Sequence, residues 1–314
     1  MIRAFVIVAA LGAAPFVACG SDDASPPASS SSTPFPEQAA TPPPSDTPEA
    51  SSDVAPYVGS LTVDPGDATL LIGTGLGLFR LKSGESKAIP AKGTLDTDVG
   101  SGSISPNLVL RFSAPSTLIA SGHPAGEGTL PEELGVIRSD DGGGTWRPLS
   151  LLGEADLHAL DVRGDRVIGH PIEEERLIVS SDGGKTFQDR TPPGMPIDVD
   201  IDPGDPDRVA LTTTDGFFVS RDAGSTWRQR DALSVETFLA WSETGPLYRV
   251  EAGGVVRASE DDGETWEERG NVGGSPSTVA AGPDGALYVA IAGAEILRSD
   301  DRGRTFTRVT QIRV

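Results

Sequence analysis

A short motif that recurs at an even spacing constrains the fold of this chain more than any other feature. Five segments follow the pattern Ser-x-Asp-x-Gly-x-Thr and then an aromatic residue, and their aspartates are Asp141, Asp182, Asp222, Asp261 and Asp301. The motif serines are 41, 40, 39 and 40 residues apart. A period of roughly 40 to 45 residues is that of a four-stranded propeller blade. The repeat therefore predicts an all-β chain folded as a β-propeller.

The chemistry of the motif is that of a turn. Ser and Asp side chains hydrogen-bond to turn amides, Gly accepts a positive φ, and the aromatic ring is suited to packing between blades. We therefore expect the five aspartates to be structural, and the Asp-box turns to join the third strand of each blade to the fourth.

Apolar alternation around the motif predicts the strands of one unit at 197–201, 208–212 and 216–220, and a fourth strand that begins at Trp227. The same order occurs earlier at 57–63, 70–73 and 76–81, where Lys82 to Glu85 replace the motif. Residues 57–314 number 258, and sharing them among six blades gives a blade length close to the observed spacing of the motif. We predict six blades, with seven as the weaker alternative. They form one domain because a blade cannot bury both of its faces alone.

The first 18 residues are typical of a signal peptide. Arg3 precedes an apolar run from Ala4 to Ala18 that is too short to span a bilayer as a helix, and Cys19 follows it. The residues Phe16 to Cys19 resemble the lipobox of bacterial lipoproteins, although Phe16 stands where Leu is usual. The resemblance implies that Cys19 is lipidated. The alternative is an ordinary secretory signal with an incidental cysteine.

Residues 19–56 are rich in Ser, Pro, Thr and Ala, and they contain too few apolar side chains to form a core. We expect them to be a disordered tether. A net charge of −21, from 25 basic and 46 acidic residues, opposes binding to nucleic acid. A single cysteine permits neither a disulfide within the chain nor a thiolate metal cluster. The sequence thus predicts an extracytoplasmic monomer, held at the bacterial cell membrane by its lipid.

The Asp-box turns resemble those of the sialidase-type, or BNR-repeat, superfamily, which also includes xyloglucan hydrolases, sortilin-type receptors and photosystem assembly factors. Longer stretches are similar to a family of bacterial lipoproteins labelled sialidase-like glycosylhydrolases: VDPGDATLLIGTGLGLFRL, LIASGHP, LGVIRSDDGGGTWRPLSLLGEADLHAL and LRSDDRGRTFTRV. Members of that family commonly open with a His-any-His-Gly-Leu strand, whereas this chain has Tyr57 to Leu61. The resemblance implies a propeller, and its label rests on the repeat and assigns no activity by itself.

Sialidase chemistry, as the resemblance implies it, needs three arginines, a tyrosine nucleophile paired with a glutamate, and an aspartic acid in the central cup. The strands expected to be innermost are 57–63, 108–113, 157–162, 197–201, 236–241 and 277–281, and Arg111 is the only arginine among them. Tyr57 is the tyrosine that could serve as the nucleophile, and it has no obvious glutamate partner in the sequence. These residues argue against an enzyme of that type.

Propeller topology places the starts of the innermost strands and the ends of the second strands on the face opposite the Asp-box turns. All three histidines of the chain and several acidic side chains fall on that face: His123, His158, His170, Glu127, Glu133, Glu154 and Asp156. Imidazoles beside carboxylates could bind a divalent metal or another ligand, although spacings of 35 and 12 residues match no compact metal motif. The alternative is that Gly-His-Pro is a repeated turn and the glutamates are solubilising. No cofactor is otherwise required.

We therefore predict a membrane-tethered binding module that recognises a glycan, a peptide or an envelope protein through the His-bearing face. The first alternative is a sialidase-like glycoside hydrolase, for which Glu127, Glu133, Glu154 and Asp156 are the candidate acids and bases. The second alternative is an extracytoplasmic assembly factor.

Overall fold

The computed structural model describes residues 55–98, 100–104, 108–125, 129–172, 174–232 and 236–313. The predicted signal peptide, Cys19 and nearly all of the predicted tether lie outside these ranges. Residues 51–314 form one compact unit. Among the described residues, no helix is long and apolar enough to cross a membrane.

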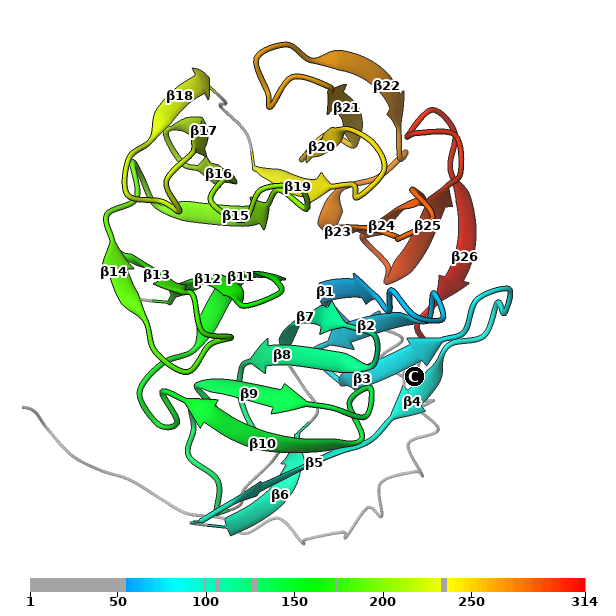
Figure 1. The fold of residues 1–314 in the computed structure, drawn as a ribbon. Coiled ribbons are helices and arrows are strands. Elements are labelled where there is room, and N and C mark those ends of the chain that lie inside the picture. The colour runs from blue at the N-terminus through cyan, green and yellow to red at the C-terminus, as the bar shows by residue number, and fades with distance from the viewer. Residues whose placement is uncertain are drawn as a thin grey trace, which may run out of the picture. The chain divides into compact units, whose positions relative to one another are not determined.

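Six antiparallel sheets stand around a central axis, as Figure 1 shows. Each blade has four antiparallel strands in sequence order, and one sheet has two further strands at its outer edge, so the predicted six-bladed β-propeller is confirmed. The innermost strands are β1 (Val58–Val63), β7 (Val109–Ala114), β11 (Leu157–Arg163), β15 (Pro196–Ile201), β19 (Thr237–Trp241) and β23 (Pro276–Ala281). The second strands are β2 (Leu70–Thr74), β8 (Thr117–Ser121), β12 (Arg166–Pro171), β16 (Val209–Thr213), β20 (Leu247–Glu251) and β24 (Leu287–Ile291).

The outer half of each blade contains the third and fourth strands. The third strands are β3 (Gly77–Leu81), β9 (Val136–Ser139), β13 (Leu177–Ser180), β17 (Gly216–Ser220), β21 (Val255–Ser259) and β25 (Glu295–Ser299). The fourth strands are β4 (Ile89–Ala91), β10 (Thr145–Ser150), β14 (Gln188–Arg190), β18 (Arg228–Asp231), β22 (Glu267–Asn271) and β26 (Thr307–Gln311).

Blade two carries an additional hairpin, β5 (Gly93–Thr97) and β6 (Gly100–Ile104), on its outer edge. Strand β5 pairs in parallel with β10, and Trp146 lies opposite Leu95. A side chain at Gly93 would meet the indole nitrogen of Trp146 at 2.8 Å, so this close approach requires glycine. Nothing in the 40-residue repeat predicted this hairpin, because it is an insertion between blades one and two.

Each Asp box is a closed set of local hydrogen bonds between the third and fourth strands. In blade two, the Ser139 hydroxyl donates to Asp141 at 2.8 Å and accepts from the Gly143 amide at 2.8 Å. The amide and hydroxyl of Thr145 both donate to Asp141. Burial opposes ionisation here, but these hydrogen bonds outweigh it and lower the pKa of Asp141 to about 2. The aspartate therefore stabilises its turn as a carboxylate.

The aromatic residue after each Asp box packs against the preceding blade. Trp146 joins the core of Leu71 and Leu78 from blade one, and Trp266 meets Phe217 of blade four edge to face at 5.4 Å between ring centroids. The ring closes where the core of blade one, including Ile72, packs against Ile296 of blade six. Buried apolar contacts between blades thus complete the domain.

Candidate functional site

Backbone hydrogen bonds show which turns lie at each of the two ends of the propeller. The Asp-box turns contact the turns between the first and second strands: the Gly142 amide donates to the Ser116 carbonyl at 2.7 Å, and the Gly183 amide donates to that of Asp165 at 2.9 Å. The innermost strands begin at the other end. We call that end the His face, and it consists of the residues before the innermost strands together with the turns after the second strands.

One backbone hydrogen bond recurs on the His face in five blades. A turn amide after the second strand donates to the carbonyl of the residue that precedes the innermost strand. The pairs are Gly75 with Tyr57, Ile172 with Asp156, Thr214 with Met195, Ala252 with Glu236 and Ala292 with Ser275, at distances of 2.9 to 3.1 Å. Residues in these equivalent positions differ between blades, whereas the Asp boxes at the other end repeat. Variation of this kind is expected where a scaffold presents a binding surface.

His123 and His158 meet on a single buried carboxylate. The Nε2 atom of His123 lies 3.0 Å from Oδ2 of Asp156, and the Nε2 atom of His158 lies 2.8 Å from the same oxygen. Asp156 is buried, and its Oδ1 atom has no hydrogen-bond partner among the described residues. The fold thereby brings together two of the three histidines, one from blade two and one from blade three.

Both imidazoles are held by hydrogen bonds, and those of His158 favour its charged form. Nδ1 of His123 lies 2.8 Å from the Glu132 carbonyl oxygen, so both ring nitrogens of His123 face acceptors. The hydrogen bond that His158 donates to Asp156 raises the pKa of His158 above its ordinary value, although partial burial of the ring opposes the shift.

The third histidine has a different hydrogen-bond partner. His170 is buried in β12, and its Nδ1 atom lies 2.9 Å from the Arg176 carbonyl oxygen. Within the described part of the chain, His170 makes no hydrogen bond or ion pair with Asp156. Its contact resembles a strand-end cap more than a share in the His123–His158 pair.

The four carboxylates named as acid or base candidates have different surroundings. Glu127 lies outside the described residues, Glu154 is exposed, and Glu133 is half-buried. Asp156 is the one that is held in a defined geometry, between two imidazoles. No group of three His, Cys, Asp or Glu side chains that could hold a metal ion occurs among the described residues. A divalent metal at the His face stays a prediction.

Apolar side chains are exposed around the same face. Tyr57, Leu76, Ile172 and Met195 are exposed by 66, 54, 44 and 45%, and all four occupy the turns that define the His face. Ile89, exposed by 45%, is the fifth large hydrophobic of this kind, and it begins β4 at the Asp-box end. A cavity of about 180 Å³ lies beside this surface, with Tyr57, Thr74, Leu108 and His158 in its wall.

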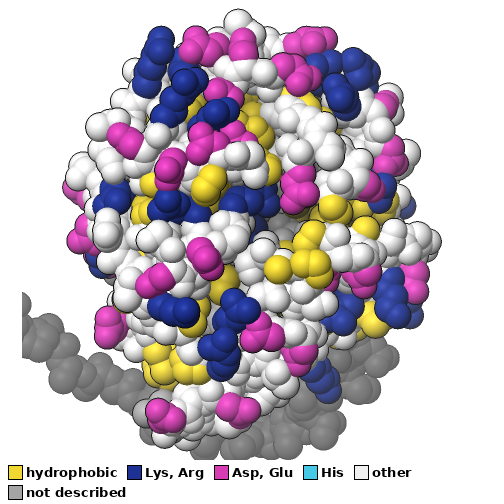
Figure 2. Space-filling view, viewed as in Figure 1, with side chains coloured by type: hydrophobic (Ala, Val, Ile, Leu, Met, Phe, Trp, Pro, Cys, Tyr) yellow, Lys and Arg dark blue, Asp and Glu magenta, His cyan; other side chains and the backbone are white. Residues whose placement is uncertain are grey.

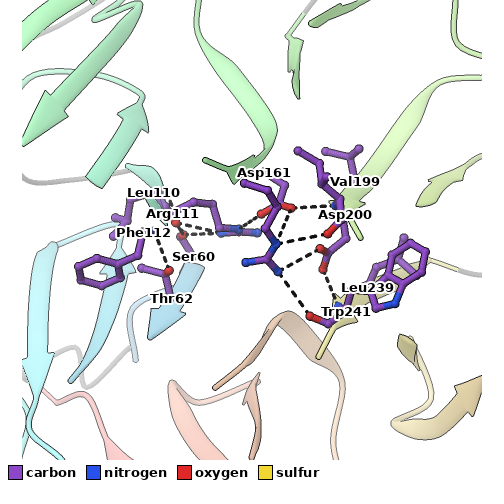
Figure 3. A network of polar contacts seen from close by, with 12 residues as sticks. Ser60, Thr62, Leu110, Arg111, Phe112, Asp161, Val199, Asp200, Leu239 and Trp241 are labelled. Atoms are coloured by element: carbon purple, nitrogen blue, oxygen red, sulfur yellow. Dashed lines mark hydrogen bonds and ion pairs between the residues drawn. The ribbon is translucent and has the colours of Figure 1, made fainter. Parts of the chain in front are cut away.

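The central channel holds a second polar group (Figure 3), formed by Arg111, Asp161, Arg163, Asp198 and Asp200 on the innermost strands β7, β11 and β15. Arg111 Nε lies 3.5 Å from Asp161 Oδ1, and Arg163 Nη2 lies 3.6 Å from Asp200 Oδ1. Figure 2 shows Lys and Arg side chains beside the hollow at the centre of the ring, and no histidine is visible on the face it draws.

Most of these channel side chains satisfy the free edges of neighbouring innermost strands. In β7, β15 and β19, backbone amides donate to a polar side chain on the innermost strand of the preceding blade, at 2.8 to 3.2 Å. The amides pair as Leu110 with Ser60, Phe112 with Thr62, Ile201 with Asp161, Leu239 with Asp198 and Trp241 with Asp200. Buried polar backbone groups are costly when unpaired, so this arrangement stabilises the ring.

Two of the channel carboxyls resist ionisation. Burial raises the pKa of Asp198 to about 6, although Arg111 and two backbone amides oppose the shift. Burial and the nearby charge of Asp161 raise the pKa of Asp200 well above its usual range, with Arg163 opposing. The Oδ1 atom of Asp200 accepts no hydrogen bond among the described residues. The channel thus contains one carboxyl, Asp198, whose pKa lies near 6, and a second, Asp200, that is also harder to ionise than an exposed aspartate.

The sequence identified only part of this channel. Strand β11 extends to Arg163, one residue beyond the predicted strand, so Arg111 is not the only arginine on an innermost strand. Among the described residues that line the channel cavity, Arg111 and Arg163 are the two arginines, and no third completes a triad. The alternation Asp198-Val199-Asp200 in an otherwise apolar strand was the available signal for the carboxyls.

Solved structures similar to this chain include two classes of β-propeller protein. YCF48 bound to D1 peptide matches at 19% identity over 60% of this chain and 62% of that one, with a TM-score of 0.40. An ancestral GH74 enzyme matches at 13% identity over 82% of this chain and 38% of that one, with a TM-score of 0.52. YCF48 from Cyanidioschyzon merolae matches at 13% identity over 81% of this chain and 85% of that one, with a TM-score of 0.49.

The chain spans less than two thirds of the first two of these proteins. No family model matches it, and no curated protein matches it significantly. At 13% identity, the likeness to the GH74 enzyme shows a common fold and nothing about activity. The comparisons are therefore consistent with the propeller that the Asp boxes predicted, and the function has to be argued from the site.

Proposed function

We propose that this protein is an extracytoplasmic, lipid-anchored binding module that recognises a polypeptide through its His face. The observation that carries the proposal is the gathering there of Tyr57, Leu76, Ile172 and Met195, four of the five large hydrophobic side chains that are exposed among the described residues. Exposed apolar side chains gathered on one face mark interaction sites. Met and Tyr are moreover enriched at protein interfaces.

The charge of the surrounding loops indicates what kind of polypeptide would fit. Glu132, Glu154, Glu175 and Glu236 are exposed in the turns of the His face, and Arg176 nearby is already paired with Glu174. An acidic rim around apolar side chains is complementary to a partner with apolar anchors flanked by Lys or Arg. A glycan fits this surface less well, because Tyr57 is the only exposed aromatic ring that the described part of this face offers as a stacking surface.

The hydrolase alternative has weaker support from the geometry. A glycosidase acid must be free to protonate the leaving oxygen. Asp156 Oδ2 is already within hydrogen-bonding distance of two imidazoles. The carboxylate is thus placed to orient His123 and His158, which suits a polar contact for a ligand better than proton transfer to a sugar.

The proposal is tested with two fluorescein-labelled peptides of equal length, one alternating Leu and Lys and the other alternating Leu and Glu. Fluorescence anisotropy of the purified protein should show saturable binding of the Lys peptide, at least tenfold tighter than the Glu peptide. Ile172→Ser with Met195→Ser should weaken that binding about tenfold, since each removes an exposed apolar contact. Ile89→Ser is the matched control and should leave it unchanged.

Three outcomes would count against this function. Equal affinity for the two peptides would remove the charge argument. Equal weakening by Ile89→Ser would place the binding surface elsewhere. Release of reducing sugar from envelope glycans by the wild-type protein, lost in His158→Ala, would favour the hydrolase instead.

A further inference from the structure

Five of the six contacts between neighbouring blades are filled by an aromatic ring from an Asp box. Each ring packs with residues of the blade before it: Trp146, Phe187, Trp227, Trp266 and Phe306. Blade one has no Asp box, and its contact with blade six closes the ring. That contact is the one that lacks an Asp-box ring, although Phe79 of the third strand β3 packs there against the core of blades one and six.

Strand register identifies the residue that replaces the ring. Ser139, the first residue of an Asp box, pairs with Leu118, and Leu81 pairs in the same way with Leu70 in blade one. Trp146 follows Ser139 by seven residues, and the residue seven after Leu81 is Ala88. Ala88 packs against the core of blades one and six, but its methyl group fills far less space than an indole.

A groove of about 460 Å³ lies at this contact. Its wall on the blade-one side includes Leu70, Leu81 and the turn Lys82 to Ser86, which stands where the other blades have an Asp box. Tyr288 and Arg298 of blade six form part of the opposite wall. The groove therefore occupies the place between blades that an Asp-box turn and its ring occupy elsewhere.

The wall of blade six matches surfaces that receive rings in other contacts. Tyr288 is equivalent by register to Tyr248, since Leu287 pairs with Ser299 as Leu247 pairs with Ser259. Tyr248 belongs to the core against which Phe306 packs. At the closing contact the Arg298 guanidinium lies over the Tyr288 ring, at 5.2 Å from its centroid, and donates to its hydroxyl.

An equivalent arginine shows what a filled contact looks like. Arg298 precedes Ser299 as Arg80 precedes Leu81, and Arg80 donates at 2.5 Å to the Gly142 carbonyl in the Asp box of the next blade. Arg298 instead pairs with Asp284 and Asp300 of its own blade. The surface of blade six thus offers the ring-binding wall without the Asp-box ring that would cover it.

We propose that this groove binds an aromatic side chain of a partner polypeptide, which takes the place of the missing sixth ring. Arg298 and Arg308 in the groove wall are paired with carboxylates of blade six, whereas Lys82 has no ion pair among the described residues, so an acidic residue next to the aromatic one would pair with Lys82. The site lies at the Asp-box end, away from the His face, and it selects the opposite charge. It is therefore independent of the polypeptide site proposed above.

The probe is the dipeptide acetyl-Asp-Trp-amide, compared with acetyl-Asp-Ala-amide and acetyl-Lys-Trp-amide, in saturation-transfer NMR with the full chain. We expect saturable transfer to the indole protons of the first, at least fivefold weaker binding of the Lys peptide, and no transfer to the Ala peptide. Binding of all three peptides alike, or of none, would overturn the proposal.

Two tryptophan variants locate the site. Ala88→Trp supplies the missing ring from within the chain and should weaken binding of acetyl-Asp-Trp-amide at least tenfold. Ile89→Trp adds the same ring one residue further on, at an exposed position, and should leave binding unchanged. Unchanged binding in Ala88→Trp would contradict the proposal.

A second measurement keeps the test decisive if Ala88→Trp does not fold. Photo-crosslinking of the wild-type chain with acetyl-Asp-benzoylphenylalanine-amide should label the segment 81–86 or Tyr288, and labelling confined to other segments would refute the site. Phe35 is the one aromatic residue between positions 19 and 56. Binding of the probe only in the Phe35→Ala variant would assign the groove to the chain itself and would overturn the role for a partner.

Discussion

His158 and Asp156 form the best-defined polar pair on the His face, with Nε2 of the imidazole 2.8 Å from Oδ2 of the carboxylate. The carboxylate is buried, and the imidazole is about half exposed. This hydrogen bond couples the charge of an exposed ring, in the surface proposed to bind a ligand, to a fixed group in the protein. The pair therefore makes the His face sensitive to pH.

We expect His158 to titrate above the ordinary histidine value of about 6.5. The folded-state pKa is raised, so the pair stabilises the fold below the unfolded pKa, and this contribution is lost as pH rises through the folded pKa. The NMR shift of the His158 ring proton, followed from pH 5 to 9, gives the midpoint. Asp156→Asn should lower that midpoint, and an unchanged midpoint in this variant would show that Asp156 does not set the charge.

The channel carboxyls and the Asp boxes should give the domain its greatest stability near pH 4 to 5. The pKa of Asp198 is raised to about 6, so the folded state binds the extra proton and stability increases as pH falls from 7 towards about 4. The Asp-box aspartates have lowered pKa values, about 2 for Asp141, so their contribution is lost below about pH 4.

Urea unfolding at half-unit pH steps tests this profile. Asp198→Asn should remove most of the rise between pH 7 and 4, which we expect to be about 1 to 2 kcal/mol. Asp141→Asn should instead flatten part of the acid limb and leave the neutral limb in place. A stability that falls steadily from pH 7 to 4 in the wild-type protein would contradict the raised pKa of the channel carboxyls.

Arg163 should be important for stability at neutral pH and less so in acid. Its Nη2 atom is 3.6 Å from Asp200, and its Nε atom is 4.0 Å from Asp161. Removing one partner from a buried ionic group costs about 3 kcal/mol, but a neutral carboxyl needs no partner. We therefore expect Arg163→Met to destabilise the domain by about 3 kcal/mol at pH 7.5 and by about 1 kcal/mol at pH 5.

Two comparisons separate this electrostatic effect from lost packing. Adding Asp200→Asn to Arg163→Met should restore part of the loss at pH 7.5. Arg166→Met removes a pair with Asp207, an exposed residue in the turn between β15 and β16 of the next blade, and it should cost less than about 1 kcal/mol. A pH-independent loss in Arg163→Met, with no recovery in the double variant, would mean that the guanidinium acts by packing alone.

Metal analysis of the purified protein tests the divalent-metal prediction for the His face. Nε2 of His123 and Nε2 of His158 both contact Asp156 Oδ2 directly, so a metal ion at this position would have to displace both hydrogen bonds. We expect less than about 0.1 metal ion per chain after exposure to zinc and dialysis, equally in wild type and in His158→Ala. About one zinc ion per wild-type chain, lost in His123→Ala and in His158→Ala, would instead establish a metal site.

Most of the architecture could be predicted from local pattern. The spacing of the Asp boxes fixed the blade period, and the alternation of apolar residues placed strands such as β17 at the residues where they occur. The worn turn at Lys82 to Glu85 was likewise recognisable from its position in the repeat. The hairpin of β5 and β6 was not, because it has no counterpart in the other blades and pairs with β10 across the chain.

The sequence could predict only at which end of the propeller the candidate site lies. Topology placed the three histidines at one end, but whether they meet depends on side-chain directions and on the offset between blades. The structure brings His123 and His158 to Asp156 and directs His170 to the Arg176 carbonyl. The channel group was missed since Arg163 lies one residue past the predicted strand.

The sequence by itself determined that this chain is a six-bladed propeller, because each Asp box is held together by hydrogen bonds between residues at most four positions apart. Such local interactions leave a pattern that can be read without knowing the fold. Only the tertiary structure decided which histidines contact the same carboxylate, and between which two blades an Asp-box aromatic ring is missing. Those relationships join residues tens of positions apart, such as His123 with Asp156 and Ala88 with the core around Tyr288, and they arise from the closing of the ring.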